Sequence, residues 1–317
     1  MKNTICYNIV GVDTHKETLA CYCNGKFKEF KTNISGFQQA VKWAGNAAWA
    51  IEGAYCFGQP FTAYLIKNGH NVYEVNPILT KTWRGVIATT NPKNDYGDAK
   101  VISLFAKPEN LQKVSLDLLK EKELLQQRDF AVKEKVRITN NLKMLFFTRG
   151  LKCPFNNLAS VKAINWLIEQ EDFILRQQGK LLKQLMQNIK EYENEIKKNM
   201  PKKAEKLMQL KGISEVRAAQ IVVETKGNVT TESRLANYAG IAPVESSSGK
   251  TKRFKTNKKG NRKLNSIFFA LSIAQIRYNP DAKKYYDKKI AEGKTPRHAR
   301  KCVARQLVRI VFNLLKD

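Results

Sequence analysis

Four acidic residues have a spacing that could bind a divalent cation. Asp95 and Asp98 are three positions apart and follow Asn94, a residue type that favours the N-cap of a helix. On a helix this spacing places both carboxylates on one face, where they repel each other unless a cation lies between them. Asp13 and Glu52 each follow a short apolar segment. Carboxylate oxygens suit Mg²⁺, which can bridge the attacking and the leaving oxygen of a phosphodiester.

The elements expected around these acids alternate between strands and helices. Strands are expected at residues 7–12, 18–23, 27–31, 47–51 and 71–75. Helices are expected from residue 35, over 58–68 and from Asp95 onward. A three-strand meander followed by alternating helices and strands is the order of a ribonuclease-H-like α/β fold. Parallel strands of such a fold gather their end residues at one edge, so the four acids should converge. The ordinary alternative is that these acids face solvent at strand ends and a helix start.

The charge of the chain points to a polyanionic partner. The 317 residues carry a net charge of +28, with a pI near 9.8. Basic residues placed on phosphates release condensed counterions, which favours nucleic acid over a membrane as the partner. The six cysteines and three histidines show no zinc-ligand spacing, so we expect the cysteines to be reduced and structural. No apolar run is long enough to span a bilayer and no signal peptide is expected, so the cytosol is the expected compartment.

The composition changes after residue 115. Leucines and other apolar residues recur every three or four positions amid charged ones, which is the pattern of a coiled coil. The second of two long helical segments carries this seam at Leu175, Leu182, Leu185, Ile189, Tyr192 and Ile196. The two segments either fold back as an antiparallel pair or pair with a second copy.

The C-terminal third contains three further motifs. Gly212 lies between two apolar helical segments, as in a helix-hairpin-helix that offers backbone N–H groups to phosphates. A Ser-rich segment at 246–248, expected to be a loop, is followed by a basic arm. A hydroxyl beside such cations would lie next to bound phosphate, where it could act as a nucleophile. The basic arm consists of Lys250, Lys252, Arg253, Lys255, Lys258, Lys259, Arg262 and Lys263.

These motifs resemble a known family of recombinases. Gly11–Lys16, Ile51–Tyr55 and Lys93–Ala99 resemble the three acidic motifs of the DEDD transposases of the "one-ten" insertion-sequence family, relatives of Piv-type DNA invertases. The segments Gly240–Lys250 and Lys258–Arg262 resemble the second block of that family. The resemblance covers nearly the whole chain, in the expected order.

The resemblance implies three domains. They are a RuvC-like α/β domain of ribonuclease-H fold over 1–108, a coiled-coil helical region over 115–200, and a mostly α-helical transposase domain over 201–317. The last domain would hold the helix-hairpin-helix-like segment and the catalytic serine. The chain would be a bacterial, cytoplasmic, nucleoid-associated protein.

The resemblance also implies the active residues and the partners. Mg²⁺, for which Mn²⁺ may substitute, would be held by Asp13, Glu52, Asp95 and Asp98. Ser248 would form a 5′-phosphoserine link to DNA, and the serine triplet leaves Ser247 as the alternative nucleophile. The acidic site and the serine would meet from different protomers of a homo-oligomer, a dimer or a tetramer. The partners would be donor DNA, target DNA and a bridge RNA that guides the reaction, with no membrane.

Two other functions account for part of the sequence. A RuvC-like, structure-specific nuclease that uses water would need the four acids but not Ser248. A non-catalytic nucleic-acid-binding protein would explain the positive charge but not the expected convergence of carboxylates.

Overall fold

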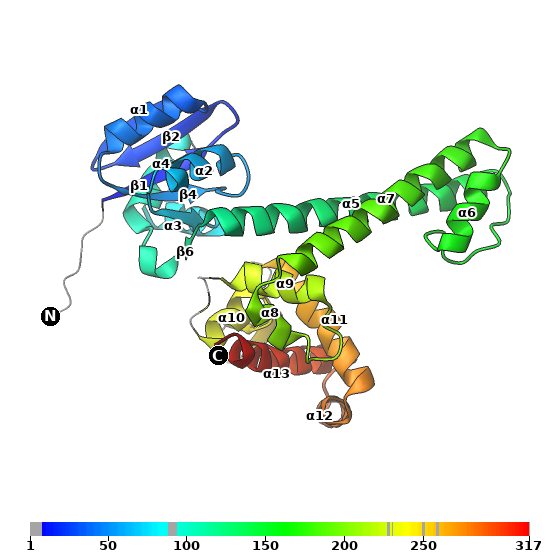
Figure 1. The fold of residues 1–317 in the computed structure, drawn as a ribbon. Helices are drawn as coiled ribbons and strands as arrows, with labels where there is room; N and C mark the ends of the chain where they lie inside the picture. Colours follow the sequence, from blue (N-terminus) through cyan, green and yellow to red (C-terminus); the bar gives the residue numbers. More distant parts are fainter. Residues whose placement is uncertain are drawn as a thin grey trace.

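The computed structural model describes residues 8–87, 94–226, 229, 231–248, 251–257 and 260–316. Its N-terminal part is built on a six-stranded sheet (Figure 1). The strands are β1 (Ile9–Thr14), β2 (Thr18–Cys23), β3 (Lys26–Lys31), β4 (Ala48–Glu52), β5 (Val72–Val75) and β6 (Gln112–Lys113). Their order in the sheet is β3-β2-β1-β4-β5-β6. β1, β4 and β5 run parallel, whereas β2, β3 and β6 pair antiparallel with their neighbours. This mixed sheet is compatible with a ribonuclease-H-like fold.

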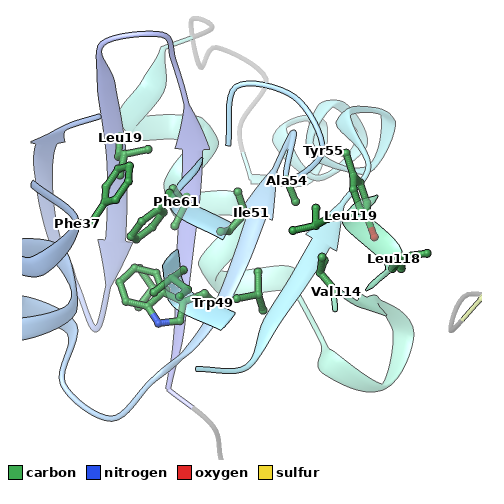
Figure 2. Close-up of a cluster of buried hydrophobic side chains, with 14 of the residues drawn as sticks. Leu19, Phe37, Trp49, Ile51, Ala54, Tyr55, Phe61, Val114, Leu118 and Leu119 are labelled. Carbon is green, nitrogen blue, oxygen red and sulfur yellow. The ribbon is translucent and has the colours of Figure 1, made fainter. Parts of the chain in front are cut away.

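Helices cover both faces of the sheet. They are α1 (Ile34–Ala44), α2 (Gln59–Lys67), α3 (Pro77–Ile87) and α4 (Asp95–Phe105), followed by a 3₁₀ turn at Pro108–Asn110. On one face, Trp49 and Ile51 of β4 are fully buried against Phe37 of α1 and Phe61 of α2 (Figure 2). Because alternate strand residues point to opposite faces, this packing leaves the other face of the sheet for α4.

Helix α4 lies very close to β1 on that second face. A Cβ atom added at Gly11 would overlap the carbonyl oxygen of Ala99 and the amide of Ser103. The Ser103 hydroxyl also donates a hydrogen bond of 2.8 Å to the carbonyl oxygen of Ile9. Gly11 therefore lets the first turns of α4 lie beside the end of β1, which is where the acids are.

The middle of the chain is a helical hairpin. It consists of α5 (Leu116–Thr148), α6 (Val161–Glu169) and α7 (Phe173–Lys198), with α5 and α7 running antiparallel (Figure 1). Leu175 and Leu182 are buried against Ile138 and Leu142 of α5. Of the two arrangements that the seam allowed, the structure has the one in which the chain folds back on itself.

The C-terminal part is mostly helical. Its elements are α8 (Lys202–Leu207), α9 (Glu215–Thr225), α10 (Glu232–Tyr238), β7 (Pro243–Ser248), β8 (Thr251–Thr256), α11 (Arg262–Tyr278), α12 (Pro280–Ala291) and α13 (Pro296–Lys316). Gly212 lies between α8 and α9 with φ of +99°, a conformation that favours glycine.

The expectation of a loop at the Ser-rich segment was wrong. Residues 246–248 belong to β7, which pairs antiparallel with β8 so that Ser248 is opposite Thr251. The partner strand contains Thr251, Phe254 and Thr256, and β-branched and aromatic residues favour strands. Within the described ranges, no helix is long and apolar enough to cross a membrane.

Candidate metal centre

The register of the sheet and the start of α4 bring the four acids to one place. β1 and β4 pair in parallel with Val12 opposite Ile51, so the next residues, Asp13 and Glu52, occupy adjacent positions on neighbouring strands. The Asn94 side chain accepts a hydrogen bond of 2.7 Å from the amide of Gly97 and so starts α4 at the following residue.

Both acids of α4 are in its first turns. Asp95 is about half exposed, and Asp98 is buried. Since Gly11 allows α4 to lie against β1, both carboxylates come close enough to Asp13 for their charges to raise its pKa.

Two basic side chains contact this cluster. The Nε2 atom of His15 is 3.5 Å from Oδ2 of Asp13 and 3.1 Å from Oδ1 of Asp95. Oxygen atoms of these two carboxylates and a ring nitrogen of His15 all lie within 4.8 Å of one another, as ligands of one ion would. On the other side, the Nε atom of Arg84, from α3, is 3.0 Å from Oδ1 of Asp98. The guanidinium of Arg84 thus offsets part of the negative charge of the acidic cluster.

The carboxylates perturb one another electrostatically. Burial raises the pKa of Asp13; His15 lowers it, and the charges of Asp98 and Asp95 raise it further. Burial also raises the pKa of Glu52, the neighbouring Thr80 and Arg84 oppose this, and the charges of Asp13 and Asp98 add to it. These carboxyl groups are therefore held in surroundings where a divalent cation would stabilise their ionised forms.

One oxygen atom of this cluster is buried without a partner. Oε2 of Glu52 makes no hydrogen bond of good geometry within the described part of the chain, although the Thr80 side chain is near enough to lower the pKa of Glu52. A buried carboxylate oxygen without a donor is costly, and a bound cation would satisfy it. Among the described residues, the atoms close enough to share one ion belong to Asp13, His15 and Asp95, and that group does not include Glu52 or Asp98. The carboxylate oxygens of Asp13 and Asp95 are hard donors of the kind that Mg²⁺ and Mn²⁺ bind. The residues present fit a divalent metal.

Sequence reasoning missed His15, Arg84 and Thr80 as members of the site. His15 had a usable signal, since it lies two residues after Asp13. Arg84 and Thr80 belong to α3, a helix that was not predicted, and they reach the site only through the way α3 packs against α4.

The predicted serine and basic arm are described only in part. Ser248 ends β7, but the positions of its side chain and of those in β8 (Lys252, Arg253 and Lys255) lie outside what the structure describes. Lys250, Lys258 and Lys259 lie wholly outside the described residues. Arg262 and Lys263 begin α11.

Lys263 has acidic neighbours within the chain. Its Nζ atom is 3.7 Å from Oδ2 of Asp129 and 3.7 Å from Oε1 of Glu224. These long, partly exposed pairs contribute little to stability.

The fold and the site define a class: α/β proteins with a cluster of carboxylates, at strand ends and a helix start, suited to a divalent cation. Comparison with known families gives two independent matches. A family model for DEDD transposases of the IS110 type matches residues 10–146, and the model described as "Transposase IS116/IS110/IS902 family" matches residues 204–287. The chain belongs to the IS110 family of DEDD transposases.

Three curated relatives agree with this assignment. The chain is 36% identical over 106 residues to an uncharacterized 43.6 kDa protein of insertion element IS110 from Streptomyces coelicolor, a match over 32% of this chain and 26% of that protein. It is 29% identical over 118 residues to an uncharacterized 42 kDa protein of IS900 from Mycobacterium paratuberculosis, a match over 36% of this chain and 30% of that protein. It is 30% identical over 139 residues to an uncharacterized 44.8 kDa protein of IS116 from Streptomyces clavuligerus, a match over 42% of this chain and 35% of that protein. The matches therefore span about a third or less of the relatives' lengths.

Proposed function

We propose that this protein is the transposase of an insertion element and cuts and rejoins DNA at a metal-dependent carboxylate site. The observation that carries the proposal is the convergence of Asp13, Glu52, Asp95 and Asp98, from two strands and a helix, in a protein of net charge +28. Membership of the IS110 family supports DNA as the substrate.

The four carboxylates would hold Mg²⁺ or Mn²⁺ against the scissile phosphate. When bound, such an ion supplies charge stabilisation for the phosphoryl group and makes an attacking hydroxyl more acidic. The protein's part is to hold the carboxylates in place. The sheet register fixes Asp13 beside Glu52, and the close packing of α4 on β1 sets Asp95 and Asp98 near them.

The nucleophile in this proposal is Ser248, with Ser247 as the alternative. Its hydroxyl oxygen would attack a DNA phosphorus atom, forming a serine–phosphate bond and breaking the bond from phosphorus to the 3′-oxygen. The hydroxyl loses its proton and the departing 3′-oxygen gains one. The covalent link keeps the energy of the phosphodiester, so strands can be exchanged without ATP. The family resemblance and the basic residues that follow the serine in the sequence support this assignment.

A guide RNA and a second protomer complete the proposal. In the family, a bridge RNA pairs with target and donor DNA, and the acidic site and the serine come from different copies of the chain. The large positive charge suits several polyanionic strands bound at once. A homodimer or homotetramer acting in the bacterial cytoplasm, at the nucleoid, would provide the composite site.

A comparison of Glu52→Gln with Asp287→Asn tests the metal-dependent site. Gln keeps the size of Glu52 but removes its charge, whereas Asp287 is exposed on α12, far along the chain from the acids. We expect Glu52→Gln to stop Mg²⁺-dependent strand cleavage while leaving DNA binding intact, and the control variant to cleave normally. Cleavage by Glu52→Gln at the wild-type rate would refute the role of this carboxylate.

A further inference from the structure

His15 is fixed by its backbone at the junction between β1 and β2. Its amide donates a hydrogen bond of 2.9 Å to the carbonyl oxygen of Thr18, and its own carbonyl oxygen accepts one of 3.3 Å from the Thr32 hydroxyl. These contacts join the end of β1 to the start of β2 and to the residue that follows β3. The backbone therefore presents the imidazole ring to the carboxylate cluster from a defined position.

The imidazole contacts two carboxylates that come from different elements. Its Nε2 atom is 3.5 Å from Oδ2 of Asp13, on β1, and 3.1 Å from Oδ1 of Asp95, on α4. Ligand atoms that are about 2.1 Å from one octahedral ion are about 3 Å apart when they are adjacent. The two contacts of His15 therefore have nearly the separation of neighbouring ligands. The Asp13 side chain is 14% exposed, whereas those of His15 and Asp95 are about half exposed, so an ion can enter from solvent.

A ring nitrogen changes which ions such a site prefers. Mg²⁺ binds oxygen donors and gives up its water reluctantly. Imidazole nitrogen is a softer donor than carboxylate oxygen and suits transition-metal ions. Mn²⁺ accepts both kinds of donor, so a ligand set with one histidine favours Mn²⁺ over Mg²⁺.

We propose that His15 is a direct ligand of the divalent ion and gives the site a preference for Mn²⁺ over Mg²⁺, an inference that rests on the proposed function. His15 adds a nitrogen donor to the four acids, which supply only oxygen. The preference for Mn²⁺ comes from this nitrogen, while the carboxylates still allow Mg²⁺ to bind.

The other role open to His15 is that of a cation paired with Asp13 and Asp95. The same distances suit an ion pair, provided that the ring is protonated. The two roles predict different effects when the imidazole is removed. Loss of a ligand weakens the binding of the ion that prefers nitrogen, whereas loss of a competing cation strengthens the binding of both ions.

A comparison of His15→Gln with His298→Gln tests the proposal. Glutamine offers an oxygen donor in place of the ring nitrogen, so Mg²⁺ should still bind to His15→Gln. His298 is exposed on α13, in the C-terminal part of the chain, and serves as the matched control. Binding of Mn²⁺ and of Mg²⁺ to each full-length protein is measured by calorimetry at pH 8, without nucleic acid.

We expect His15→Gln to bind Mn²⁺ about tenfold more weakly or worse, since even residues that only orient a ligand change metal affinity by about 10- to 100-fold. Its affinity for Mg²⁺ should change much less, so the ratio of the two affinities should fall about tenfold. His298→Gln should keep the wild-type ratio. An unchanged ratio, or tighter binding of both ions by His15→Gln, would overturn the proposal.

Pulsed electron paramagnetic resonance of Mn²⁺ bound to the wild-type protein gives a result that does not depend on the folding of a variant. The spectrum should show the coupling of a directly bound ¹⁴N nucleus, and growth with ¹⁵N-labelled histidine should replace it with ¹⁵N coupling. The coupling should persist in His298→Gln and be absent from His15→Gln. Bound Mn²⁺ without nitrogen coupling would overturn this inference alone. If the wild-type protein bound neither ion, the proposed metal-dependent function would fail together with it.

Discussion

Removal of one acid from the carboxylate cluster should stabilise the metal-free protein. Asp13→Asn keeps the shape of the side chain and removes its charge. The Asp13 side chain is only 14% exposed, and it is close to Asp95, Asp98 and Glu52, whose like charges destabilise the folded state. A site that is unfavourable for the bare protein and favourable with a cation is what a metal-binding role requires.

The distances in the cluster set the size of this effect. Oxygen atoms of Asp13 and Asp95 lie within 4.8 Å of each other. At that separation the repulsion is about 0.9 kcal/mol in water and about 3.5 kcal/mol at an effective dielectric constant of 20. Asp95 is half exposed, so we expect a gain of about 1 to 3 kcal/mol in the free energy of unfolding. For a domain of about 100 residues, in which each kcal/mol shifts the melting temperature by roughly 4 to 8 °C, the melting temperature should rise by at least about 4 °C.

Thermal unfolding followed by tryptophan fluorescence measures this change, with EDTA present at pH 7.5. Mg²⁺ should then raise the melting temperature of the wild-type protein and have a much smaller effect on Asp13→Asn, because binding to the folded state alone is stabilising. Asp287→Asn, at an exposed acid of α12, is the matched control and should shift neither value appreciably. A lower melting temperature for metal-free Asp13→Asn, with an unchanged Mg²⁺ response, would refute the account of the site.

Three further outcomes follow from the structure. The pKa values of Asp13 and Glu52 are raised in the folded state, so the metal-free protein loses stability as the pH rises through them; the Mg²⁺-induced rise in melting temperature should therefore grow as the pH rises from about 4 to neutral, and a constant shift over that whole range would contradict this. Lys122→Met should cost about 3 to 5 kcal/mol in chemical denaturation because it leaves Glu74, 3.3 Å away, without its cation, whereas the double variant with Glu74→Gln should recover most of that loss. Leu182→Ala should destabilise the hairpin by about 2 to 5 kcal/mol without altering the sedimentation of the native protein; a change in sedimentation would place the seam between subunits instead.

The sequence was most informative about the strands of the N-terminal sheet. The strand at residues 18–23 has the expected bounds, and the others differ by one or two residues, because apolar segments between turn residues are a local signal. β6 has only two residues, and nothing in so short a segment marks a strand. β6 forms because the folded chain brings residues 112 and 113 beside β5, where they pair with Glu74 and Tyr73. This pairing depends on the tertiary structure and not on the local sequence.

The sequence also indicated where some residues of the acidic site lie, but not all of them. Asp13 and Glu52 could be placed because they lie near the ends of neighbouring strands, and Asn94 marked the start of α4. Arg84 could not be placed, because its contact with Asp98 depends on the packing of α3 against α4. Oxygen atoms of Asp13 and Asp95 lie close together, and Asp98 and Glu52 are near enough to interact with them electrostatically. The metal-binding and catalytic roles of all four acids, and that of Ser248, remain predictions.

The most direct test of the proposed function is to look for protein joined covalently to DNA. The protein is incubated with Mg²⁺, the ends of its insertion element and RNA transcribed from that element, then denatured and digested. The account predicts a DNA-linked peptide that contains residues 246–248, absent from Ser248→Ala and from Glu52→Gln. A peptide that persists in Ser248→Ala but is lost in Ser247→Ala would move the nucleophile by one residue. Wild-type cleavage by Ser248→Ala, with free DNA ends and no adduct, would contradict the account and make water the nucleophile.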